Sequence, residues 1–167
     1  MSLLPAGYPE QAFDAFDVLK SRKTLSLDDM KVLAMIECFG EAFYYVLAEN
    51  VQHAEARALL RRNGQEERGH AHRMLKAIRL KSGQSFDLPA NDENPFFRFL
   101  PTELSCDANI IASLEAGEAD GDLTYQAWAD NEPDAMVANL LRQNGLEETR
   151  HGQRATEVRR LLDLSAA

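Results

Sequence analysis

Two short stretches of the sequence have the residue types and spacing to bind metal ions. RRNGQEERGHAHR at 61–73 and RQNGLEETRHGQR at 142–154 each place a glutamate three residues before a histidine; the pairs are Glu67 with His70, and Glu148 with His151. On a helix this spacing puts both side chains on one face, one turn apart. Each pair could therefore supply two metal ligands, although one such pair alone is a weak signal, since many solvated helix faces carry one.

The two stretches belong to a longer internal repeat. They are offset by 81 residues and share the pattern Leu-Leu-Arg-x-Asn-Gly-x-Glu-Glu-x-x-His. At the same offset Glu37 matches Glu118, each 30 residues before its own Glu-x-x-His. This register favours a tandem duplication of one helical hairpin over chance periodicity, and it predicts two hairpins related by a pseudo-twofold axis.

Four long helices are expected to position these residues. Ser26, with Asp28 and Asp29 after it, predicts the start of a first helix that runs to a break near Asn50. A second helix is expected over about 53–82, ended by Gly83. A third is expected over about 107–130, and Asn131 to Pro133 suit the N-cap and early proline of a fourth, which should run to about 163.

The remaining segments are a leader and a long connection. Residues 1–25 are expected to be irregular at first and then to form a short amphipathic piece with Phe13, Phe16 and Leu19 that packs on the main body. Residues 83–106 contain three prolines and no periodic pattern, which predicts a connection without regular structure. The expected fold class is therefore all-α: a single-domain four-helix bundle with repeats at 27–82 and 107–163. One long crossover would connect the second and third helices, as in ferritin-like bundles.

Composition narrows the function classes. A net charge of −9 over 167 residues disfavours nucleic acid as a partner, because phosphate binding needs a basic surface. No stretch approaches the roughly 20 apolar residues of a membrane span, and no secretory leader is evident. Cys38 and Cys106 form no Cys-x-x-Cys pair, which argues against a disulfide framework or a rubredoxin-type site. We expect a protein of the cytoplasm.

The convergent ligand set predicts the kind of metal. A glutamate from each of two helices and a Glu-x-x-His from each of the other two would meet in the bundle core and supply four carboxylates and two imidazoles. Four carboxylates offset the charge of two divalent cations; without metal they would repel one another in a low-dielectric interior. Oxygen-rich ligation without thiolate favours iron or manganese over structural zinc.

These motifs resemble those of ferritin-like carboxylate-bridged di-iron proteins, closest in style to the rubrerythrin group, over about residues 27–162. The resemblance implies a cofactor of two iron ions, with manganese as the alternative. It implies Glu37 and Glu118 as single-glutamate ligands, Glu67 and Glu148 as bridges, and His70 and His151 as ligands of one ion each.

Glu115, one turn before Glu118, is an alternative or additional ligand under this resemblance. The repeat favours Glu118, because Glu115 matches Ala34. The chain also lacks the rubredoxin module of rubrerythrins, which implies a separate electron-donor protein.

Several residues near the predicted ligands have two possible roles. Tyr44 and Tyr125 could hydrogen-bond the site or be plain core. Gly40 and Gly121 could leave room beside the metals or allow tight helix packing. The remaining expectations are that Glu66 and Glu147 are solvated and that His53 and His72 are surface residues.

The resemblance implies a di-iron oxidoreductase that reduces hydrogen peroxide or activates dioxygen; a di-manganese catalase is a variant of the same class. The alternative from another class is iron storage or ferroxidase activity of the ferritin type. A metal-free helical scaffold is a third hypothesis. Homodimerisation through a second helix face is plausible.

Overall fold

Four long helices form the bundle in the computed structural model, which describes residues 3–164. They are α2 (Leu27–Glu49), α3 (Ala54–Ser82), α4 (Ala108–Asn131) and α5 (Ala135–Leu161), and a shorter α1 (Ala12–Lys20) precedes them. The described residues contain no strand. The all-α class is therefore confirmed.

The helix boundaries follow from local capping. Ser26 forms a capping box with Asp29, as the sequence indicates. At the start of α3, His53 Nδ1 accepts a hydrogen bond from the Ala56 amide. Gly83 ends α3 with a φ of 70°, a left-handed conformation that glycine adopts at little cost.

The predicted start of the last helix was wrong. Asp134, not Asn131, caps α5, accepting hydrogen bonds from the amides of Met136 and Val137. Asn131 instead ends α4, where its side chain donates to the Ala127 carbonyl. A carboxylate directly before the first helical residue can reach these free amides, whereas Asn131 lies too far upstream.

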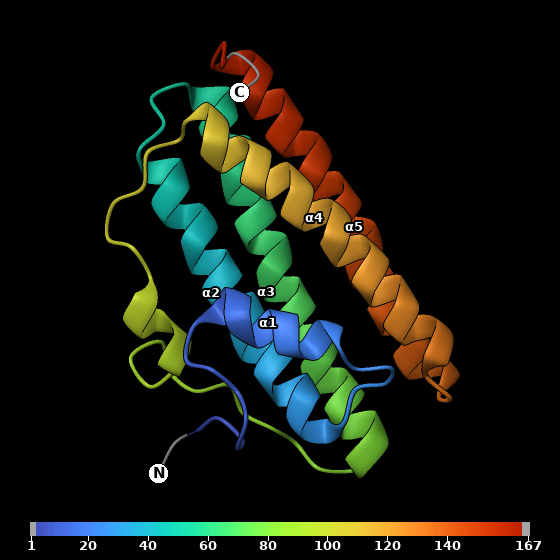
Figure 1. The fold of residues 1–167 in the computed structure, drawn as a ribbon. Helices are drawn as coiled ribbons and strands as arrows, with labels where there is room; N and C mark the ends of the chain where they lie inside the picture. The colour runs from blue at the N-terminus through green and yellow to red at the C-terminus, as the bar shows by residue number, and fades with distance from the viewer. Residues whose placement is uncertain (1–2, 165–167) are drawn as a thin grey trace.

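The chain traces two antiparallel hairpins, α2 with α3 and α4 with α5 (Figure 1). The segment between α3 and α4 runs back along the bundle, so that α4 begins at the same end as α3. The principal contact between the hairpins is made by α3 and α5.

The connection contains one regular element, which the sequence analysis did not predict. Pro95–Phe99 form a 3₁₀ helix, η1. Phe96 is fully buried in it, and the Asn94 side chain donates to the Met35 carbonyl at 3.0 Å. One anchored aromatic residue and one buried hydrogen bond thus attach the connection to α2.

Two apolar clusters fill the bundle. One surrounds Leu33, Met74 and Trp128, and the other surrounds Leu47 and Leu60. The inward-facing acids and histidines occupy the level between these clusters.

The leader helix α1 packs across the bundle rather than along it (Figure 1). Leu19 is fully buried, and Phe16 packs edge-on against Trp128 of α4 with centroids 6.0 Å apart. Lys20 forms an ion pair with Asp120 of α4 at 2.9 Å. Phe13, expected on the same apolar face, is 67% exposed. α1 therefore joins α2 to α4.

Candidate metal centre

Six inward-facing side chains from four helices converge at the middle of the bundle. Each is less than one-tenth exposed, and both histidines are fully buried. They form two overlapping groups, each able to hold one ion; the first is Glu37, Glu67, His70 and Glu148, and the second is Glu67, Glu118, Glu148 and His151. The six residues that the sequence predicts are brought together here.

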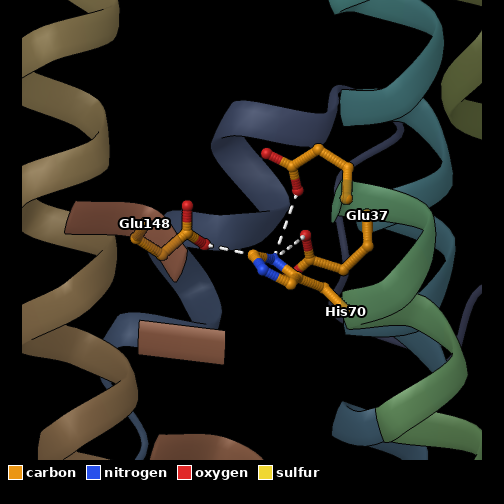
Figure 2. A group of neighbouring side chains, drawn as sticks. Glu37, His70 and Glu148 are labelled. Carbon is orange, nitrogen blue, oxygen red and sulfur yellow. Dashed lines mark ion pairs between the residues drawn. The ribbon is translucent and has the colours of Figure 1, made fainter. Parts of the chain in front are cut away.

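The first group is centred on His70. Its Nδ1 lies 3.5 Å from a Glu37 oxygen, 3.4 Å from Glu67 and 3.5 Å from Glu148. Figure 2 shows Glu37 and Glu148 reaching this imidazole from opposite sides. One nitrogen thus faces three carboxylates contributed by three helices.

The second group repeats this arrangement around His151. Its Nδ1 lies 3.2 Å from Glu67, 3.5 Å from Glu118 and 3.4 Å from Glu148. Glu67 and Glu148 belong to both groups, so each could bridge two ions. The two imidazole rings stack with centroids 5.3 Å apart.

The donor atoms fit a pair of metal ions better than they fit one another. Within residues 3–164, no nitrogen of His70 or His151 has a hydrogen-bond partner of good geometry, although carboxylate oxygens surround both Nδ1 atoms. Buried polar atoms without hydrogen bonds are costly. Cations placed between the carboxylate oxygens and the two Nδ1 atoms would give both kinds of atom a partner.

The electrostatics of the buried carboxyl groups also favour a site for positive ions. Burial, together with the charge of Glu67, raises the pKa of Glu37 to about 7. Burial and the charge of Glu118 raise the pKa of Glu148 well above its usual value. These carboxyl groups therefore take up protons unless another positive charge is supplied.

The histidines partly supply that charge. Burial opposes protonation of His70, but the charge of Glu148 and contacts with other glutamates outweigh burial and raise its pKa well above the usual value. Burial likewise disfavours the Glu67 carboxylate, but contacts with His151 and His70 lower its pKa well below the usual value. Two divalent cations would take the place of these protons.

The expectation that Glu66 and Glu147 are solvated was wrong. Glu147 lies 3.2 Å from His70 Nε2, and Glu66 lies 3.2 Å from His151 Nε2. Glu66 directly precedes Glu67, and Glu147 directly precedes Glu148. Because neighbouring residues of a helix point in different directions, Glu66 and Glu147 face the adjacent helix instead of the core. A carboxylate beside Nε2 orients the imidazole and makes Nδ1 a better metal ligand.

Two arginines hold these acids in place, and the sequence analysis did not single them out. Arg73 binds Glu147 at 2.7 Å, and it donates to the Asn144 side chain at 2.8 Å. Asn144 in turn donates to the His70 carbonyl. Contacts with His70 and with Arg73 lower the pKa of Glu147 to about 2 despite its burial.

The same network occurs around the other imidazole. Arg154 binds Glu66 at 2.7 Å and the Asn63 side chain at 2.9 Å, and Asn63 donates to the His151 carbonyl at 3.2 Å. Arg73 and Arg154 are also 81 residues apart. The repeat register was therefore the signal that could have identified them.

Tyr44 and Tyr125, for which the sequence left two interpretations open, both contact the site. The Tyr44 hydroxyl donates to Glu118, and the Tyr125 hydroxyl donates to Glu37. Each bond crosses from one hairpin to the other. Burial raises both tyrosine pKa values well above normal, with the neighbouring carboxylates adding to it, so both hydroxyls stay neutral donors.

Glu115 lies away from the six converging residues. Its carboxylate binds Arg159 at 2.6 Å and accepts from Thr156 at 2.8 Å, and the arginine lowers its pKa. Glu118, not Glu115, therefore occupies the position equivalent to Glu37. His53 and His72 are exposed.

The two glycines make room for carboxylates. A Cβ at Gly40 would lie 3.3 Å from the Glu67 carboxyl carbon, and one at Gly121 would lie 3.3 Å from that of Glu148. Such contacts are tight for packed atoms, so any larger residue would push the carboxylates shared by the two groups.

An all-helical bundle with a buried cluster of four glutamates and two histidines defines a ferritin-like protein whose core fits a di-metal site. The family model for rubrerythrin matches residues 33–158. The chain therefore belongs to the rubrerythrin family. No curated protein and no solved structure gave a significant match. No helix of the described residues is long and apolar enough to cross a membrane.

Proposed function

We propose that the protein is a di-iron oxidoreductase that reduces hydrogen peroxide or activates dioxygen, with electrons delivered by a separate donor protein. The observation that carries the proposal is the pair of equivalent donor groups sharing Glu67 and Glu148. Two ferrous ions bound by these groups would supply two electrons to one oxidant molecule and so avoid one-electron radical products. Peroxide reduction then balances as one peroxide, two electrons and two protons giving two waters.

The residues of this chain have distinct roles under the proposal. His70 and His151 would each bind one ion through Nδ1, and Glu67 and Glu148 would bind both. The hydroxyls of Tyr44 and Tyr125 fix the two remaining glutamates by hydrogen bonds. The carboxylates of Glu67 and Glu148 would provide part of the negative charge that offsets the charge of the two ions.

Iron is proposed over manganese because of the family, since the donor set suits either metal. Metal analysis of the purified protein, followed by measurement of peroxide and dioxygen consumption with a chemical reductant, tests the proposal. We expect two iron ions per chain and turnover that is lost in Glu148→Ala, with the helical circular dichroism signal unchanged. An iron-loaded wild-type protein that consumes neither oxidant would contradict the proposal.

Iron storage is the rival function that the same donor set would support. Storage requires a hollow shell of many subunits, whereas the proposed enzyme does not. Light scattering of the purified protein separates the two: a particle of shell size that retains hundreds of iron ions would favour storage.

A further inference from the structure

A cavity of about 270 Å³ connects the donor cluster to the surface between α1, α2 and α4. Its outer end includes Phe13, which is 67% exposed, and its inner end includes all four converging glutamates, each less than one-tenth exposed. Neither His70 nor His151 is among the described residues that line it. The carboxylate side of the cluster is therefore the side open to a ligand.

The cavity walls are aromatic and aliphatic. Phe13 of α1 packs edge-on against Phe39 and Phe43 of α2, with centroids 6.0 and 6.1 Å apart. Phe16 and Ile36 extend this surface, and Leu114 faces it from α4. Between the mouth and the carboxylates, a ligand would meet hydrocarbon on most sides.

The size exceeds what an oxidant alone requires. A water-sized molecule takes up roughly 30 Å³, and an apolar cavity of roughly 150 Å³ is enough to bind benzene. The cavity also takes in the space beside the four glutamates, and it has room for an organic molecule of about the size of benzene.

The charges at the mouth favour a neutral ligand. Lys20 is the one cationic side chain among the described lining residues, and it is paired with Asp17 at 2.7 Å and Asp120 at 2.9 Å. No unpaired positive charge is available there for an anion, while the acids along the cavity would repel one.

We propose that this cavity binds a small, uncharged, apolar organic molecule, about the size of a substituted benzene, with one end against the glutamates. Its position beside a metal pair rests on the proposed function; its binding in the aromatic cavity does not. α1 forms one wall of the binding site, and the ion pair between Lys20 and Asp120 holds that wall in place.

Gly117 of α4 offers a direct test. It lines the cavity, and a Cβ added there would meet no described atom within 4 Å. Gly117→Leu therefore begins its side chain in open space and adds bulk to the cavity lining, and leucine favours the helix over glycine by about 1 kcal/mol. Ala116→Leu is the matched control, because Ala116 is exposed and is not among the lining residues.

The probe is 4-fluorotoluene, titrated into the full-length metal-loaded protein and followed by ¹⁹F NMR. We expect saturable binding of one probe per chain to wild type and Ala116→Leu, and binding weakened by about tenfold or more in Gly117→Leu. Ser113→Phe, a second substitution of a lining residue, should weaken binding as well and guards against misfolding of the first variant.

Metal content is measured on the same samples. Absence of saturable binding to wild type, or equal binding by both cavity-filling variants, would overturn the proposal. Because that result can occur with two ions bound and oxidant consumed, failure of the cavity proposal is distinguishable from failure of the di-iron proposal.

Discussion

The two hairpins present the same residues to the metal cluster and different residues to the cavity. At the cluster, every residue has its counterpart 81 positions later, including Tyr44 with Tyr125 and Arg73 with Arg154. At the cavity wall the correspondence ends, since Phe39 and Phe43 of α2 match Asp120 and Thr124 of α4.

This difference assigns the two proposed functions, metal binding and ligand binding, to different sets of residues in one fold. Equivalent donors can hold two equivalent ions, so similarity between the hairpins serves metal binding. A site for one organic ligand needs a large apolar surface on one side and open space on the other. Ile36 of α2 contributes to the apolar surface, whereas its counterpart in α4, Gly117, has no side chain and leaves the space open. Under the cavity proposal, the unmatched positions form the ligand side of the site.

The largest expected effect tests the shared carboxylates. Glu67→Ala and Glu148→Ala should each weaken metal binding by more than about 100-fold, because each removes a carboxylate that faces both imidazoles. Isothermal titration and elemental analysis measure the loss. A variant that loses one ion and keeps the other tightly bound would show that the two groups are independent.

A smaller effect is expected from the acids behind the imidazoles. Glu66→Gln and Glu147→Gln should each lower metal affinity by about 10- to 100-fold, since each weakens the contact that orients a histidine. Glu157→Gln is the control, because that acid pairs with Arg160 at the surface of α5. Equal affinities in all three variants would refute the orienting role.

The pH dependence of the metal-free protein tests Glu37. The pKa of Glu37 is raised to about 7 in the folded protein, from 4.5 for an ordinary glutamate, so between pH 4.5 and 7 this carboxyl group holds more proton in the folded than in the unfolded state. Stability should therefore fall as pH rises through this window, by at most about 3 kcal/mol from this group. Urea unfolding of chelator-treated protein at pH 5 and pH 7 measures the change, and Glu37→Gln should reduce it. A dependence that survives Glu37→Gln in full would assign the effect to other groups of the cluster.

The smallest effect is expected at Glu115, which has no acidic counterpart in α2. Glu115→Ala should leave two ions bound and cost less than about 1 kcal/mol, because it removes only a partly exposed ion pair with Arg159. Thermal unfolding with metal analysis checks both statements. A drop in metal content would restore Glu115 as a ligand.

The sequence predicted the four long helices, apart from the start of α5, and the six side chains that converge in the core, because acids on an apolar stripe are visible in a single helix. The roles of Glu66 and Glu147 were missed because these acids do not lie on the apolar stripe of their helices. Each points away from its own helix's inward stripe, and only the packing of α3 against α5 shows that it meets a histidine of the other hairpin. The periodicity of one helix contains no information about its neighbour.

The cavity was beyond sequence analysis for a related reason. Phe13 and Phe16 indicate that α1 packs on the main body, but their spacing does not show that α1 crosses from α2 to α4 and lines one cavity with the glutamates. The resemblance led to an expectation of peroxide or dioxygen, and the room for a larger molecule became visible only with the helices in place.

The contacts that cross between hairpins have a consequence for how the protein opens. His70 lies beside Glu147, and Tyr125 binds Glu37, so each half of the cluster depends on the opposite hairpin. Separating the hairpins would break both halves at once. Metal ions bound between these groups would add their binding free energy to the docking of the hairpins, and amide hydrogen exchange along α3 and α5 should slow together when metal is added.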